Sequence, residues 1–312
     1  MSHILEDRAA FETAMQEIDA EMRAAGVPIP ARQIDGARRF AIKHMPGMVI
    51  IGPGQNIMSR RVTDWFSARY GERLSLDPSD GHFVTEIGGD FFRVAPPKFF
   101  GMVKFFADRT LPEYDRGGLD RPVVYNIMES VRDITEELSA SLTDDAVRAI
   151  HNDFFFGLRA TSFLEQNKEI ELINKARGDL MTAVDQLLTH PIRAGDAKWS
   201  SLQAAEKLLK ATIEAHGGKF EKVHKVVQLS EQLTKLGVAG NTRIYASKIQ
   251  CTPGIRYGEE QCTTREAFDA HKAFISLTVE IYLTSRAFKS KLSWVDIPMS
   301  WNPPSPLGPR RG

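Results

Sequence analysis

The sequence predicts a mainly α-helical protein of the α+β class, in which a small N-terminal α+β unit precedes a four-helix bundle. Apolar residues recur at helical spacing almost without interruption from Ile127 onward. Short apolar runs bounded by glycine and proline, as expected for strands, occur only before that point. Four helical segments joined mostly by short links complete the second half, which favours a bundle.

The N-terminal part alternates helices and strands. An apolar stripe of Phe11, Met15, Ile18 and Met22 predicts a first helix that ends at Gly26. Further helices are expected at 31–44 and 56–71. Strands are expected at 48–52 (MVIIG), in FFGMVKFFA, and in HFVTEIGGDFFRVAP, where Gly88 and Gly89 form a hairpin turn.

The helical half begins with a face formed by Ile127, Val131, Ile134 and Leu138. Thr143 then predicts a helix start, because its hydroxyl can cap free backbone N–H groups and two aspartates follow it. The four bundle helices are expected at 174–188, 199–216, 223–236 and 263–286. Within the second of them, Glu206 and Lys210 have the spacing of an outward-facing ion pair.

Charge is distributed unevenly although the net charge is zero. Residues 1–169 contain 20 Lys and Arg against 26 Asp and Glu, whereas residues 170–291 contain 18 against 13. Only the second half is therefore a plausible partner for anions, and its excess is mild for a protein that grips long nucleic acid. We expect an α+β unit at 1–140, a connecting helix at 141–169, the bundle at 170–291 and a proline-rich tail at 292–312.

Composition excludes several classes of protein. No apolar run approaches the length of a membrane-spanning helix, and the N-terminus is acidic rather than typical of a secretory signal. The two cysteines, Cys251 and Cys262, cannot form a structural zinc site alone. We therefore expect a cytoplasmic protein with free thiols, no membrane partner, no metal and no cofactor.

Four segments of the second half, in this order, resemble the HEPN family (higher eukaryotes and prokaryotes nucleotide-binding domain). They are ARGDLMTAVDQLL, LQAAEKLLKATIEAHGG, the His-containing VHKVVQL, and IRYGEEQCTTREAFDAHKAF. The resemblance covers roughly 120 residues, and its most specific part is AAEKLLKA. It implies an antiparallel four-helix bundle that tends to form homodimers. It also implies roles around nucleotides or RNA, often in defence or toxin–antitoxin settings or beside a nucleotidyltransferase.

Some members of the family are metal-independent ribonucleases that use an arginine and, four to six residues later, a histidine. Arg265 and His271 have this spacing at the corresponding place. The resemblance implies that the arginine stabilises charge on the phosphate and the histidine transfers a proton. The sequence departs from active members at Glu266, where they usually carry a polar group without negative charge.

A binding site requires less than a catalytic one. Lys207, Lys210, Arg256 and Tyr257, together with Arg265, are candidates to hold a phosphate and stack a base. The alternative is a solvated basic face with Tyr257 as a loop anchor.

The sequence thus favours a non-catalytic nucleotide- or RNA-associated binding module, with a regulatory or defence role. Two alternatives stay open: a ribonuclease that uses Arg265 and His271, and a dimeric scaffold that binds another protein.

Overall fold

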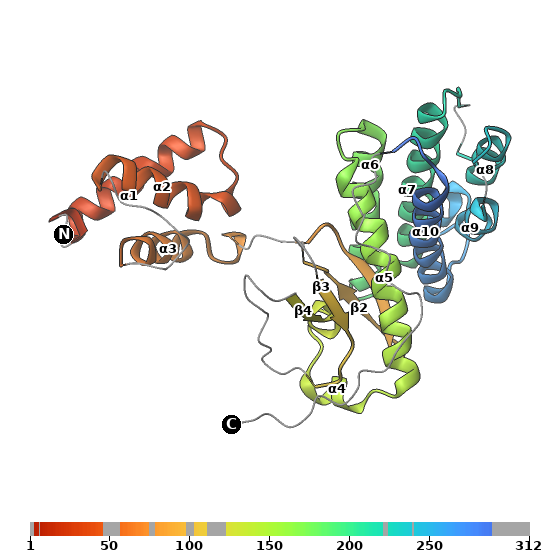
Figure 1. Ribbon diagram of the computed structural model, residues 1–312, viewed down its shortest axis with the longest axis horizontal. Coiled ribbons are helices and arrows are strands. Elements are labelled where there is room, and N and C mark those ends of the chain that lie inside the picture. The colour runs from red at the N-terminus through yellow and green to blue at the C-terminus, as the bar shows by residue number, and fades with distance from the viewer. Residues whose placement is uncertain are drawn as a thin grey trace. The chain divides into compact units, whose positions relative to one another are not determined.

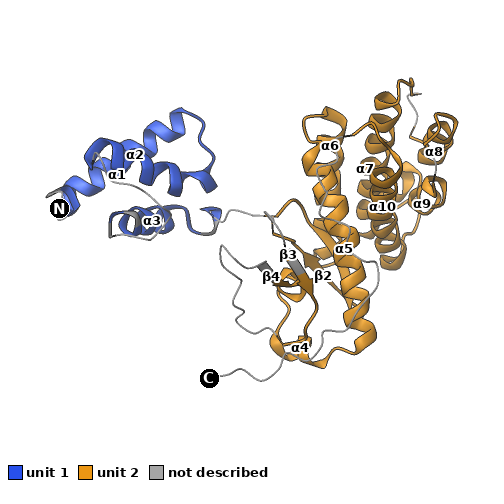
Figure 2. Cartoon of the chain, viewed as in Figure 1, with its two compact units in different colours: residues 1–78 blue, residues 79–312 orange. Residues whose placement is uncertain are grey.

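The structure is a computed structural model that describes residues 3–5, 7–45, 57–74, 79–97, 103–110, 123–220, 224–238 and 240–288. The chain divides into two compact units, residues 1–78 and 79–312 (Figure 2). Among the described residues, no helix has both the length and the apolar content to cross a membrane. The strand expected at 48–52 lies outside the described residues.

The described residues of unit 1 form the helices α1 (Arg8–Ala24), α2 (Arg32–His44) and α3 (Ile57–Tyr70). The predicted stripe of Phe11, Met15, Ile18 and Met22 is buried in its core. Asp19 is also fully buried there and is held by Arg23, Arg32, Arg69 and Tyr70, at distances of 2.5 to 3.3 Å. A buried carboxylate is tolerated because these groups satisfy its oxygen atoms.

The described residues of unit 2 begin with four short strands. The predicted hairpin is confirmed: β1 (Phe83–Ile87) pairs antiparallel with β2 (Asp90–Val94), and Val84 lies opposite Arg93. Its turn uses positive φ angles at Gly88 (63°) and Gly89 (94°), which glycine adopts at little cost. A second two-stranded sheet pairs β3 (Val103–Phe106) parallel to β4 (Val123–Asn126).

The helices of unit 2 follow the strands. They are α4 (Glu136–Ser141), α5 (Asp144–Gln166), α6 (Glu171–Leu188), α7 (Ala194–Ala215), α8 (Val226–Lys235), α9 (Thr242–Ile249) and α10 (Thr264–Thr284). Thr143 caps α5 as predicted, since its Oγ1 accepts a hydrogen bond from the backbone N–H of Ala146 at 3.2 Å. In Figure 1, α6, α7 and α10 run side by side, and α8 and α9 lie at the edge of this bundle.

The predicted fold class, mainly α-helical with a small α+β part, is confirmed. One helix was not predicted, because α9 lies between the helices expected at 223–236 and 263–286. The helical stripe expected from Ile127 is wrong. Residues Ile127–Ser130 form a 3₁₀ turn, and α4 starts only at Glu136. Ile127 and Val131 are nonetheless buried, whereas Ile134 and Leu138 are only partly buried, so a short irregular segment buries two of the four residues of the predicted helix face.

The division between the units falls at residues 78 and 79, inside the segment 1–140 that the sequence analysis treats as one unit. The reason is the hairpin, which shares the hydrophobic core of the bundle. Phe83, Val84 and Ile87 of β1 lie in one buried cluster with residues of α5, α6 and α10. Strand β1 contacts all three helices, and this contact decides how the site below is built.

Candidate anion-binding cleft

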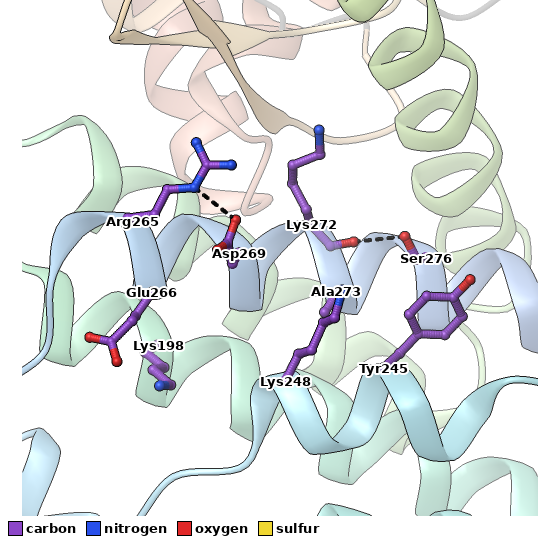
Figure 3. A pocket seen from close by; sticks show the side chains of 9 residues that line it. All are labelled: Lys198, Tyr245, Lys248, Arg265, Glu266, Asp269, Lys272, Ala273 and Ser276. Atoms are coloured by element: carbon purple, nitrogen blue, oxygen red, sulfur yellow. Dashed lines mark hydrogen bonds and ion pairs between the residues drawn. The ribbon is translucent and has the colours of Figure 1, made fainter.

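A cleft of about 510 Å³ lies between α7, α9 and α10. Helix α10 contributes most of its wall, and α7 and α9 contribute the rest. The residues that line it are Lys198, Tyr245, Lys248, Arg265, Glu266, Asp269, Lys272, Ala273 and Ser276. In Figure 3, Arg265, Asp269 and Lys272 extend from one side of α10, whereas Lys198, Lys248 and Tyr245 approach it from the neighbouring helices. The lining thus carries four cations against two carboxylates.

Two of these cations are held in ion pairs. Arg265 Nη1 lies 2.8 Å from Glu86 Oε2, and Arg265 Nε lies 3.1 Å from Asp269 Oδ1. Lys272 Nζ lies 2.7 Å from Asp153 Oδ1. Lys198 and Lys248 form no ion pair with a carboxylate among the described residues. These two unpaired lysines are therefore the cations that are available to an incoming anion.

The carboxylate of Glu266 caps the N-terminal end of α10, where the helix begins. Thr263 and Glu266 form the predicted capping box, in which each side chain accepts a hydrogen bond from the other's backbone N–H. The hydrogen bonds from the backbone and side chain of Thr263 lower the pKa of Glu266, and the nearby charge of Lys198 lowers it further. Glu266 is therefore a fixed negative charge at one end of the cleft.

Tyr245 gives the cleft an aromatic side chain. It precedes Lys248 by three positions on α9, so both project from the same side of that short helix. Lys248 is exposed and Tyr245 is half-buried. A cation beside an aromatic ring is an arrangement that binds a phosphate and stacks a base.

His271 lies apart from this cleft. Its side chain is fully buried, and Nε2 accepts a hydrogen bond from the backbone N–H of Val84 at 3.0 Å. Burial, with a smaller contribution from the charge of Lys272, lowers the pKa of His271 to about 3. The ring lines a separate cavity of about 190 Å³, which Phe83, Phe156 and Ile275 make largely apolar.

The structure therefore does not bring Arg265 and His271 into one cavity of this chain. Arg265 is 63% exposed at the cleft, whereas His271 is covered by β1. Their separation of six positions places them on different faces of α10. Both, however, contact strand β1, Arg265 through Glu86 and His271 through Val84.

Lys207 and Lys210 are engaged within the bundle. Lys207 is paired with Asp179 of α6, and Lys210 Nζ lies 2.7 Å from Glu206 Oε1. The expected outward orientation of the Glu206–Lys210 pair is wrong, because the two side chains are only 7% and 11% exposed. Lys210 Nζ also lies 5.2 Å from the centre of the Phe220 ring, and His224 Nδ1 lies 2.8 Å from Glu206 Oε2.

Arg256 and Tyr257 lie at the other end of α7. Arg256 Nε is 3.8 Å from Asp196, in the first turn of that helix, and Tyr257 is 70% exposed. Asp196 precedes Lys207 by eleven positions, or roughly 16 Å of helix at 1.5 Å per residue. The four predicted binding residues thus do not form one cluster.

Nucleophilic thiol chemistry and metal binding have little support in this region. Burial raises the pKa of Cys251 to about 11 and also raises that of Cys262, so neither thiol is activated as a nucleophile. Among the described residues, no group of three or more His, Cys, Asp or Glu side chains is placed to hold a metal ion.

Sequence reasoning identified Arg265 but missed Lys198, Tyr245, Lys248 and Lys272. Two of the four lie on α9, which the sequence analysis did not predict as a helix. Tyr245 and Lys248, three positions apart between Asn241 and Gln250, were the available signal. Their helical spacing becomes informative only once that segment is known to be a helix beside α10.

Part of unit 2 matches a known protein family. Residues 170–271 match the family model of the HEPN domain. Neither the curated proteins nor the solved structures contain a match to this chain. The matched segment runs from the start of α6 into α10 and includes Lys198, Tyr245, Lys248, Arg265, Glu266 and Asp269 of the cleft. The C-terminal part of this chain therefore carries a HEPN domain.

Proposed function

We propose that the chain is a non-catalytic nucleotide- or RNA-associated module, and that the cleft between α7, α9 and α10 binds a phosphate group of that ligand. A HEPN domain indicates a nucleotide- or RNA-associated role. The observation that carries the proposal is the pair of unpaired lysines, Lys198 and Lys248, in a cleft with Tyr245. Charge-assisted hydrogen bonds from lysine are among the stronger contacts to phosphate.

The environment of His271 supports binding rather than catalysis. A general acid or base works best when its pKa is close to the operating pH and it can reach the reacting atom. The pKa of His271 is about 3, and its Nε2 is occupied by Val84. With β1 in place, His271 cannot exchange a proton with a ligand beside Arg265.

Charge reversal in the cleft tests the proposal. We expect Lys248→Glu to lower the affinity for a fluorescent adenine nucleotide about tenfold, since one cation becomes an anion and roughly 1.4 kcal/mol of binding free energy is lost. Fluorescence anisotropy at a fixed, low salt concentration measures the affinity, because salt weakens such contacts.

Lys235→Glu is the matched control. Lys235 and Lys248 are both exposed lysines in the last turn of a short neighbouring helix, but Lys235 does not line the cleft. Its reversal should leave the affinity within twofold of the wild type. Equal affinities in the wild type and Lys248→Glu would refute the proposed site.

The ribonuclease alternative predicts RNA cleavage without metal, lost in His271→Ala. The proposal expects no cleavage by either protein. The scaffold alternative predicts that the protein binds no nucleotide or RNA at all. A homodimer, a nucleotidyltransferase partner and a toxin–antitoxin or defence role are further parts of the proposal, and sedimentation of the full chain tests the first of them.

A further inference from the structure

We infer that Glu86 and Asp153 are specificity-determining residues, which restrict the cleft to the terminal phosphate of a mononucleotide and disfavour an RNA backbone. The inference rests on the proposed function, since it concerns the same cleft. Both carboxylates come from outside the matched HEPN segment, Glu86 from β1 and Asp153 from α5. Both pair with cations of α10.

Strand β1 holds these carboxylates in place through three consecutive residues. The backbone N–H of Val84 donates to His271, the hydroxyl of Thr85 donates to Asp153 Oδ2 at 2.8 Å, and Glu86 accepts from Arg265. His271 thus covers the free edge of β1, where an unpaired N–H would otherwise be buried. In this chain, Arg265 and His271 each hold strand β1 against the bundle by a hydrogen bond.

The charge of the cleft follows from these contacts. The lining of the cleft has four cations and the two carboxylates of Glu266 and Asp269. When the ion-pair partners Glu86 and Asp153 are counted as well, there are four carboxylates. The eight groups carry no net charge. An extended polyanion gains affinity from many neutralised phosphates, and a cleft without net charge offers little of that gain.

A terminal phosphate differs from the internal phosphates of RNA in its charge. A phosphomonoester carries a charge of about −1.5 to −2 at neutral pH, whereas each internal phosphate of RNA carries one negative charge. The two unpaired lysines, Lys198 and Lys248, match one such group. Lys272 and Ser276 also line the apolar cavity of His271, so that cavity adjoins the cleft.

The test compares adenosine monophosphate with a 12-nucleotide RNA that has hydroxyl groups at both ends. We expect the wild type to bind adenosine monophosphate at least tenfold more tightly than this RNA. The double variant Glu86→Gln, Asp153→Asn should gain at least tenfold in RNA affinity and change its nucleotide affinity less than threefold. Its RNA binding should also depend more steeply on salt, because Arg265 and Lys272 then face phosphates.

Asp185→Asn is the control, since Asp185 pairs with Arg93 of β2 at 2.7 Å and also joins the hairpin to the bundle, but it does not line the cleft. It should bind both ligands as the wild type does. Each single variant, Glu86→Gln and Asp153→Asn, is measured as well, and circular dichroism confirms that each is folded.

The possible failures are distinguishable. If the wild type prefers the RNA, or the double variant does not gain RNA affinity, the specificity role is refuted while phosphate binding at Lys248 stands. If the wild type binds neither ligand, the proposed function fails and this inference fails with it.

Discussion

The two ends of α7 both carry lysines, but among the described residues only those toward the C-terminal end are paired with carboxylates. Lys198, near the N-terminal end, faces the cleft and has no carboxylate partner among the described residues. Lys207 and Lys210, nine and twelve positions later, are paired with Asp179 and Glu206. The helix rise separates the two regions by roughly 14–18 Å. One region is available to a ligand, and the other is part of the fold.

The difference shows what a buried ion pair does to a candidate binding residue. A lysine that is 11% exposed and paired with a buried glutamate has already lost its water, so releasing it to a ligand would leave Glu206 buried without a partner. Lys198 is half-buried but has no paired carboxylate among the described residues to leave behind, so it meets no such cost. The presence of a paired carboxylate, rather than residue type, separates the two ends of α7.

The largest expected effect lies at the C-terminal end of α7. Glu206→Ala removes the buried carboxylate that accepts from Lys210 and His224, and leaves Lys210 nearly buried without a partner. We expect the free energy of unfolding to fall by about 2–3 kcal/mol. Urea denaturation followed by circular dichroism measures this change.

The same variant should bind nucleotide as the wild type does below its melting transition, because the cleft lies elsewhere. A loss of nucleotide affinity without a loss of stability would reverse the assignment of the two regions.

A second test concerns the pH dependence of stability at His271. Its pKa is lowered from its ordinary value of 6.5 to about 3. Between these values the unfolded chain holds a proton that the folded chain does not, so stability decreases as the pH falls through this window. The slope is at most about 1.4 kcal/mol per pH unit for this one group. Urea denaturation at pH 7 and pH 5 measures it.

His271→Gln is the informative variant, because its amide oxygen can accept the Val84 N–H without titrating. We expect its stability to vary less with pH than that of the wild type. His151, whose pKa burial also lowers, is present in both proteins and does not affect the difference between them. Identical pH profiles would show that His271 is already solvated.

Much of the fold was predictable from local patterns. The hairpin followed from Gly88 and Gly89 between two apolar runs, and the starts of α5 and α10 followed from Thr143 and Thr263. These features depend on a few neighbouring residues, which is why the sequence shows them. Helix α9 did not follow, because its eight residues bury only Thr242, Ala246 and Ile249.

The site was less predictable than the fold. Arg265 was found by its spacing to His271, but each of these residues also has a partner on β1, which is 179 and 187 positions distant in the sequence. No local pattern reports such a contact. Lys207 likewise looked available, although Asp179 of α6 pairs with it. Lys210 pairs with Glu206 of its own helix, as the spacing predicts, and only the burial of that pair did not follow from the sequence.

The most direct test of the central claim compares Lys198→Gln with Lys207→Gln, two identical changes on one helix. Isothermal titration calorimetry with adenosine monophosphate measures both affinities under the same conditions. We predict that Lys198→Gln weakens binding about fivefold, or roughly 1 kcal/mol, and that Lys207→Gln changes it less than twofold. The opposite result, with binding lost in Lys207→Gln and retained in Lys198→Gln, would contradict the account and place the ligand at the other end of α7.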